Sequence, residues 1–222
     1  MAIARLITIE GVEGAGKSTV RQLVHEKLNA LSVDHILTRE PGGTAIAETI
    51  REILLKKHDE AMCAETELLL VFAGRAQHIK QVIQPALEQG RWVVSDRFTD
   101  ASYAYQGAGR GISETDIASL EKLVQHDLQP DLTFLLDIPV EQGLQRIERR
   151  AEKDRIEVEA MDFFNRIRNC YLKRAELFPQ RFRIVNAAQE LSMIKKDIDK
   201  ILEEYIKITS ALPSSRGQAA GR

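Results

Sequence analysis

The sequence is poor in cysteine and has no long apolar run. Cys63 and Cys170 are its two cysteines, and they lie far apart without metal-ligand spacing, so a disulfide framework and a zinc site are excluded. We expect both to be buried free thiols in a reducing cytoplasm. No apolar stretch approaches the roughly 20 residues that span a bilayer, and residues 1–10 lack a basic segment. We therefore expect neither secretion nor membrane insertion.

The net charge is also small. A formal charge of -2 argues against a polyanion-coating surface, and we expect no nucleic-acid partner. Any bound anion must therefore meet a local cluster of basic residues. The 44% hydrophobic and 29% charged residues are typical of a globular protein, and 222 residues suit one α/β domain.

Hydrophobic periodicity predicts an alternation of strands and helices. Strands are predicted at 3–10, 33–39, 92–95, 132–137 and 182–185. Helices are predicted at 17–31, 44–57, 61–89, 113–126, 140–150, 160–177 and 191–208, with Pro85 expected to break or kink the third. The alternation predicts an α/β fold with a doubly wound, mostly parallel five-stranded sheet flanked by helices. We expect one domain over 1–208 and a disordered tail over 209–222.

A complete phosphate-binding motif follows the first predicted strand. Residues 11–18, GVEGAGKS, match G-x-x-x-x-G-K-[ST] directly before a predicted helix. Such glycines let backbone N–H groups converge on phosphate oxygens, while Lys17 reaches the β and γ phosphates and Ser18 the magnesium ion. The motif predicts the P-loop NTPase fold, with a bound nucleoside triphosphate and Mg²⁺. The predicted ATP-binding residues are Gly11, Val12, Glu13, Gly14, Ala15, Gly16, Lys17, Ser18, Thr19 and, from a later segment, Arg146.

The group that receives the phosphate must be predicted from other segments. We find no guanine-reading [NT]-K-x-D segment, and a motor ATPase would normally be larger. Asp96 and Arg97 follow the strand at 92–95, at the sheet edge where doubly wound folds bind ligands. Arg97 could bind a second phosphate there, or form an ion pair with Asp96 that closes the strand end. The dipeptide alone leaves both interpretations open.

Three longer segments resemble the thymidylate kinase family. They are residues 96–110 (DRFTDASYAYQGAGR), residues 39–44 (REPGGT) with Arg51 further on, and residues 72–75 (FAGR). The resemblance extends from the P-loop to about Ile208. It implies transfer of the γ-phosphate of ATP to thymidine monophosphate (dTMP) with Mg²⁺, in dTTP biosynthesis, by a homodimer. The dimer contact would use the apolar faces of the helices at 44–57 and 61–89.

The resemblance also implies an acceptor site. Its residues would be Glu13, Arg39, Glu40, Arg51, Phe72, Arg75, Arg97, Ser102, Tyr103 and Gln106. Arg51 and Arg97 would bind the acceptor phosphate, because guanidinium forks suit phosphate oxygens. Phe72 would stack on thymine, although many family members carry this ring one residue earlier, where this chain has Val71.

The remaining acceptor roles are read from the same resemblance. Arg75, Ser102 and Gln106 would contact the edge of the base, and Tyr103 would crowd the sugar 2′ position. Glu13 would lie near the 3′-hydroxyl, with Arg39 and Glu40 beside the phosphate. Each has a structural alternative: Phe72 could be a core residue, Arg51 a solvated helix arginine, and Gln106 a turn residue.

Four arginines are concentrated between the helices at 140–150 and 160–177. They are Arg146, Arg149, Arg150 and Arg155, interleaved with Glu148, Glu152, Asp154 and Glu157. The charge pattern suits a solvated, salt-bridged face. The resemblance instead implies a basic lid, about residues 146–158, of the bacterial type. Because Glu13 occupies the P-loop position where some members have arginine, the lid would supply the cation between the two phosphates. Arg150 is the first choice, followed by Arg155 and Arg146.

The predicted catalytic residues are Lys17, Arg97, Arg150 and Glu13. Ser18 would bind Mg²⁺ directly, and Asp96 would orient a water on it. Two other functions stay open: a kinase for a different small acceptor, and a P-loop module that binds ATP without catalysis.

Overall fold

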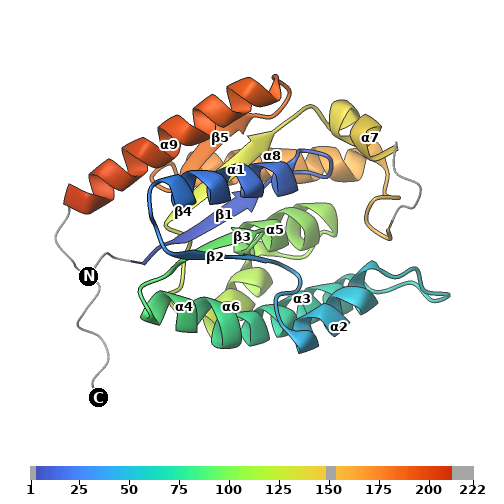
Figure 1. Ribbon diagram of the computed structural model, residues 1–222. Coiled ribbons are helices and arrows are strands. Elements are labelled where there is room, and N and C mark those ends of the chain that lie inside the picture. The colour runs from blue at the N-terminus through green and yellow to red at the C-terminus, as the bar shows by residue number, and fades with distance from the viewer. Residues whose placement is uncertain (1–3, 149–153, 212–222) are drawn as a thin grey trace, which may run out of the picture.

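Five parallel strands form the centre of the molecule in the order β2-β3-β1-β4-β5 (Figure 1). The computed structural model describes residues 4–148 and 154–211. The strands are β1 (Leu6–Glu10), β2 (His35–Arg39), β3 (Trp92–Asp96), β4 (Leu132–Asp137) and β5 (Phe182–Asn186). All strand pairs in the described chain are parallel, which confirms the predicted doubly wound sheet. Every residue of β1 is buried, as expected for a strand covered on both faces.

Helices cover both faces of this sheet. They are α1 (Lys17–Ala30), α2 (Ala45–Leu55), α3 (Ala64–His78), η1 (Ile79–Ile83), α4 (Gln84–Glu88), α5 (Thr99–Ser102), η2 (Tyr103–Gly109), α6 (Glu114–Gln125), α7 (Val140–Glu148), α8 (Met161–Leu177) and α9 (Leu191–Ala211). Helices α1 and α9 lie together on one side of the sheet, and α3, α4 and α6 lie on the other (Figure 1). Within the described ranges, none of these helices has the length and apolar character that a bilayer crossing requires.

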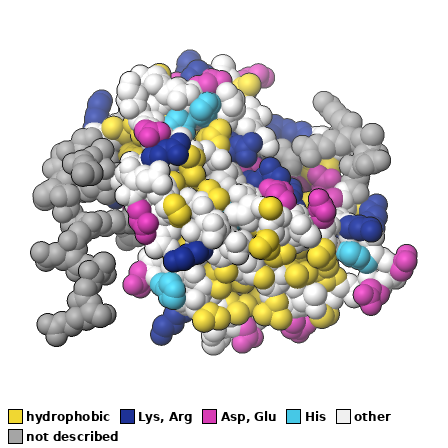
Figure 2. Space-filling model, turned by 60° about the horizontal axis from the view of Figure 1, so that its bottom comes forward, with side chains coloured by type: hydrophobic (Ala, Val, Ile, Leu, Met, Phe, Trp, Pro, Cys, Tyr) yellow, Lys and Arg dark blue, Asp and Glu magenta, His cyan; other side chains and the backbone are white. Residues whose placement is uncertain are grey.

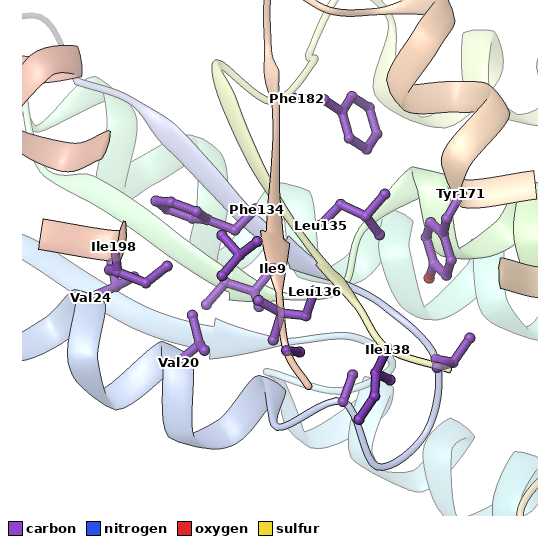
Figure 3. Packing of buried hydrophobic residues seen from close by; sticks show 14 of the residues in the cluster. Ile9, Val20, Val24, Phe134, Leu135, Leu136, Ile138, Tyr171, Phe182 and Ile198 are labelled. Atoms are coloured by element: carbon purple, nitrogen blue, oxygen red, sulfur yellow. The ribbon is translucent and has the colours of Figure 1, made fainter. Parts of the chain in front are cut away.

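The main core lies between the sheet and its covering helices. Val20 and Val24 of α1 and Ile198 of α9 point toward Ile9 and Phe134 of the strands (Figure 3). All five side chains are at most 2% exposed. Burial of each such side chain contributes about 1.5–3 kcal/mol to stability, so this packing fixes β1 and hence the start of the P-loop.

Two helical segments differ from the prediction. The helix predicted at 61–89 begins at Ala64 and passes through the π-helical segment η1 before α4. Pro85 lacks an N–H and would clash with the carbonyl four residues earlier in a regular α-helix, so the wider π turn accommodates it. The helical run α5–η2 was not predicted, because Gly107 and Gly109 lower the helix propensity of that sequence. At Gly109, an added Cβ would lie 2.6 Å from the ring of Phe163, so α8 packs too closely for a larger residue.

The end of the last helix and the burial of the cysteines also differ from the prediction. Helix α9 continues to Ala211, beyond the predicted end at Ile208, with the Thr209 hydroxyl donating to the carbonyl of Tyr205. Residues 212–222, the rest of the predicted tail, lie outside the described residues. Cys63 is exposed because it precedes α3 at the surface, and Cys170 is half-buried, so neither is the fully buried thiol expected.

Candidate active site

A cavity of about 530 Å³ opens at the carboxyl edge of the sheet. It is bounded by the P-loop, the end of β3, helices α2 and α3, the α5–η2 run and residues 154–157. Most of the predicted site residues line it: Glu13, Gly14, Gly16, Lys17, Ser18, Thr19, Arg39, Glu40, Arg51, Arg75, Asp96, Arg97, Ser102, Gln106 and Arg146. Val12 and Ala15 are buried in the core beneath the loop. Residues far apart in the sequence therefore line one cavity.

The P-loop backbone requires glycine where it meets α7. Gly14 has a φ of +73°, and an added Cβ would lie 2.0 Å from the carbonyl oxygen of Gly143. Lys17 Nζ donates to the carbonyls of Gly11 and Val12 at 3.2 and 2.9 Å. Burial, and then the nearby Arg97, lowers the pKa of Lys17. An anion in the cavity would therefore stabilise the charged form of Lys17.

Arg97 stands beside the P-loop in a strained backbone conformation. Its φ is +70°, which is uncommon for a side chain with a Cβ and is often found at functional sites. Ser95 Oγ donates to the Arg97 carbonyl at 2.7 Å and supports the turn. Arg97 Nη2 donates to Glu13 Oε1 at 2.5 Å, and Nη1 donates to the carbonyl of Gly11 at 3.3 Å. Among the described residues its carboxylate partner is thus Glu13, not the neighbouring Asp96.

The groups around Arg97 keep its guanidinium protonated. Burial alone would lower its pKa, but Glu13 reverses this and raises the pKa of Arg97 well above its ordinary value. The guanidinium carbon lies 4.6 Å from the centre of the Tyr105 ring. Tyr105 also donates its hydroxyl to Glu13 at 3.1 Å. Arg97 is therefore a permanent cation held against the P-loop.

Arg75 forms a second basic group on the opposite wall. Its side chain is 1% exposed; Nε donates to Glu40 Oε2 at 2.7 Å and Nη2 donates to Ser102 Oγ at 3.0 Å. Glu40 also contacts His78 Nδ1 at 3.0 Å. Burial alone would raise the pKa of Glu40, but Arg75 and His78 bring it below its ordinary value. Arg75 Nη1 is buried and has no partner among the residues that the structure describes. An unpaired buried N–H is costly, so it favours an acceptor atom on a ligand.

Arg39 and Arg51 line the cavity beside α2. Arg39 Nη2 donates to Glu48 Oε2 at 2.7 Å, and Arg51 Nη1 donates to the carbonyl of Pro41 at 2.9 Å. Burial, together with the nearby Arg39, lowers the pKa of Arg51. The repulsion between two nearby cations is offset by an anion that lies between them. A phosphate bound there would therefore stabilise this pair.

The structure does not place two of the predicted acceptor-site residues in the cavity. Phe72 packs on Leu68, Tyr103 and Ile117 behind the wall formed by the described residues. Val71 lines the cavity instead, because residues 71 and 75 are four apart and share one face of α3. The core alternative for Phe72 is therefore correct.

Tyr103 is the second residue outside the cavity. Its hydroxyl donates to Glu121 at 2.6 Å, and the guanidinium of Arg174 lies 3.8 Å from its ring centre. Tyr105, two residues later, lines the cavity beside Glu13. Both tyrosines belong to the run that carries the family resemblance, but a π-helix turns each residue by less than an α-helix does. Simple spacing could not tell which of them faces the ligand.

The predicted lid is only partly described. Arg146 donates to the carbonyls of Gly14 and Ala187 at 3.3 and 3.1 Å, which ties α7 to the P-loop and to the end of β5. Arg155 donates to Glu67 at 2.6 Å and lines the cavity. Arg150, the first choice for the bridging cation, lies with Arg149 outside the described residues, so its role stays a prediction.

Sequence reasoning missed a buried acid beneath the site. Glu10 ends β1, accepts from the backbone N–H of Phe98 at 2.7 Å, and accepts from the Tyr171 hydroxyl at 2.8 Å. Burial, with a smaller contribution from Asp100, raises the pKa of Glu10 to about 8. Tyr171 also accepts from Arg97 Nη1 at 3.3 Å. The available signal was an acidic residue closing a buried strand directly before the P-loop.

The residues present fit a magnesium ion. Ser18 and Asp96 line the cavity and offer the hard oxygen ligands that Mg²⁺ prefers. The described part of the chain holds no cluster of three or more His, Cys, Asp or Glu side chains suited to a metal. A site with only Ser18 and Asp96 as protein ligands would match Mg²⁺, which commonly keeps waters and phosphate oxygens as its other ligands.

Comparison with known proteins agrees with this geometry. A family model described as thymidylate kinase matches residues 9–198. The chain is 55% identical to the thymidylate kinase of Pseudomonas syringae pv. tomato over 202 residues, covering 91% of this chain and 96% of the relative. It is 55% identical to that of Ectopseudomonas mendocina over 201 residues, covering 90% and 96%. It is 56% identical to that of Pseudomonas putida strain F1 over 196 residues, covering 88% and 93%.

Proposed function

Because this chain belongs to the thymidylate kinase family, we propose that its cavity holds ATP and dTMP end to end, with the groups described above in defined roles. The protein is an ATP:dTMP phosphotransferase of nucleotide biosynthesis. One observation carries the assignment of roles. Arg97, which would bind the acceptor phosphate, forms a salt bridge with the P-loop residue Glu13 and so lies beside the donor site.

The donor side of the proposal uses the P-loop. Its backbone N–H groups and Lys17 would bind the phosphates of ATP, and Arg146 would lie toward the nucleoside near Ala187. Ser18 would bind Mg²⁺ directly and Asp96 through a water. The ion would supply charge neutralisation at the β and γ phosphates.

The acceptor side uses the opposite wall. Arg97, Arg51 and Arg39 would bind the phosphate of dTMP, and Glu13 would lie near the sugar. The unpaired Nη1 of Arg75 supports a contact with a carbonyl oxygen of the base. Tyr105, rather than Tyr103, would contact the sugar.

The chemistry requires alignment more than a base. A phosphate monoester has its second ionisation near pH 6, so the acceptor is already a nucleophile at neutral pH. Catalysis then depends on in-line positioning and on cations that reduce phosphate repulsion. Lys17 and Arg97 supply two of these cations, and the predicted lid over 146–158, with Arg150, would supply a third.

A nucleotide panel tests this proposal. Coupled ADP release is measured with dTMP, dUMP, dCMP and dGMP in parallel. We expect dTMP to give the highest kcat/KM. A kinase for another acceptor would prefer a different nucleotide, and a P-loop binding module would bind ATP without ADP release for any of them.

Arg97→Ala tests the role of the central cation. We expect kcat/KM for dTMP to fall by at least about 100-fold, while ATP binding measured by calorimetry changes little. Arg91→Ala is the matched control, since Arg91 pairs only with Asp34 at the surface in the described chain. Loss of ATP binding together with transfer would place Arg97 in the donor site instead.

A homodimer is also part of the proposal. The side of the molecule that carries α2, α3 and α6 shows a gathering of apolar side chains (Figure 2). Ile46 and Ile53 of α2 and Leu69 of α3 are 57%, 41% and 56% exposed. A patch of this kind favours contact with a second chain. The predicted cytoplasmic location stays a proposal, consistent with two free cysteines.

A further inference from the structure

Glu67 of α3 is a buried carboxylate that three segments share. Its side chain is 2% exposed and borders the cavity. It accepts from Gln106 Nε2 at 2.8 Å, from Arg110 Nε at 3.2 Å and from Arg155 Nη2 at 2.6 Å. These donors come from η2, from the loop after it and from the turn at residues 154–157. The family resemblance assigned no role to Glu67.

The carboxylate fixes the orientation of Gln106. An ionised carboxylate only accepts hydrogen bonds, so Gln106 must direct its NH₂ group toward Glu67. Its carbonyl oxygen is then the polar atom left for the cavity, which Gln106 lines. An acceptor placed opposite ring nitrogen N3 of the base favours a base that carries a hydrogen on that nitrogen. Thymine has a hydrogen on ring nitrogen N3, whereas cytosine has a lone pair there.

The same carboxylate holds the 154–157 turn. Besides Glu67, Arg155 contacts the end of α2: its Nε donates to the carbonyl of Leu54 at 2.9 Å, and its backbone N–H donates to that of Leu55 at 3.1 Å. Glu67 is almost fully buried and is the carboxylate to which Arg155 donates, so removing its charge leaves the Arg155 guanidinium without that charged partner. The position of the turn therefore depends on Glu67 together with the end of α2.

We propose that Glu67 is a positioning residue that joins base recognition to the 154–157 turn. One carboxylate presents the Gln106 carbonyl to the acceptor base and holds Arg155 at the rim of the cavity. The inference rests on the proposed function and deepens it, because it identifies Glu67 as a determinant of discrimination between thymine and cytosine.

Glu67→Gln tests the proposal with little change in shape. An amide at position 67 can donate as well as accept, so Gln106 gains a second orientation. We expect KM for dTMP to rise by about tenfold, and the ratio of kcat/KM for dTMP over dCMP to fall by about tenfold. KM for ATP should change less than about twofold, since Glu67 is on the acceptor side. Glu121→Gln is the control, because Glu121 also accepts two side-chain hydrogen bonds but does not line the cavity formed by the described residues.

A double-mutant cycle with Arg155→Met tests the link to the turn. If Glu67 acts through Arg155, the effects of the two changes on KM for dTMP will be strongly non-additive. Thermal unfolding checks that each variant is folded, and Glu67→Asp, which keeps the charge but shortens the side chain, replaces a variant that is not. Unchanged dTMP/dCMP discrimination with additive effects would overturn this inference. Failure of the unaltered protein to release ADP with dTMP would instead overturn the proposed function.

Discussion

At the scale of single residues, two tyrosines in one helical run have different surroundings. Tyr105 contacts Glu13 and Arg97, whereas Tyr103 donates to Glu121 outside the cavity. Tyr105→Phe removes the hydroxyl that helps to hold Glu13. We expect KM for dTMP to rise by about three- to tenfold. Tyr103→Phe is the matched control and should leave KM unchanged. KM for dTMP is measured for both variants by steady-state kinetics. A larger rise in KM for Tyr103→Phe would instead support the sequence-based prediction that Tyr103 contacts the sugar.

Glu10 predicts a dependence of stability on pH. Its folded-state pKa of about 8 lies above its ordinary value of 4.5, so the fold favours the neutral acid. This contribution is complete below the ordinary value and is lost as pH rises toward about 8, with a slope of at most about 1.4 kcal/mol per pH unit. The free energy of unfolding is measured with urea between about pH 5 and pH 8. It should fall with rising pH in the unaltered protein and fall less steeply in Glu10→Gln. Equal slopes in the two proteins would contradict the assignment.

Sequence analysis predicted the positively charged residues of the site more accurately than the residues that surround them in space. Arg97, Arg75 and Lys17 belong to motifs whose chemistry is explicit, and all three line the cavity. Phe72 was misplaced by a single helical position, since a rotation of about 100° per residue separates a wall residue from a core residue. Glu67 could not be recognised from sequence, because its donors lie 39 to 88 positions away along the chain.

At the scale of elements, the P-loop and α7 approach through two glycines. A Cβ on Gly143 would lie 2.6 Å from the carbonyl oxygen of Glu13. Gly143→Ala should therefore push the P-loop and α7 apart and raise KM for ATP by about tenfold, with a smaller effect on KM for dTMP. Gly74→Ala is the control, since its added Cβ would meet nothing closer than 3.7 Å. Similar kinetics for the two variants would show that the contact is not required.

Periodicity predicted the regular elements and failed at the π-helical ones. Strand β1 and helix α1 have the apolar patterns that their burial demands. Segment η2 carries two glycines and depends on packing against α8 instead. A π-helix depends on such tertiary contacts because its intrinsic stability is low, so a local pattern could not reveal it.

At the scale of the whole molecule, strand order brings the two substrate sites together. Strand β1 pairs with β3 in the register Ile9↔Asp96, so the P-loop and Arg97 leave the sheet side by side. The P-loop motif and the family resemblance predicted an anion site at each segment, but the pairing of their strands is a property of the folded sheet. The alternation of elements restricted the topology to the doubly wound class without fixing this neighbour relation.

The exposed apolar patch on α2 and α3 leads to a prediction about assembly. Leu69→Asp places a charge at its centre, and burying an unpaired carboxylate in an interface is costly. We expect sedimentation velocity to show a dimer for the unaltered protein and a monomer for Leu69→Asp. Met193→Asp is the control, because Met193 is also exposed but lies on α9, on the other side of the sheet (Figure 1).

The activity of that monomer separates assembly from catalysis. The P-loop leads from β1 into α1, which lies on the opposite side of the sheet from α3 (Figure 1), so the monomer should still bind ATP. Helices α2 and α3 carry Arg51, Glu67 and Arg75, and loss of a partner leaves these helices less supported. We therefore expect KM for dTMP to rise more than KM for ATP. A dimeric Leu69→Asp variant would place the contact elsewhere, and a monomer that lost ATP binding would mean that the second protomer supports the P-loop as well.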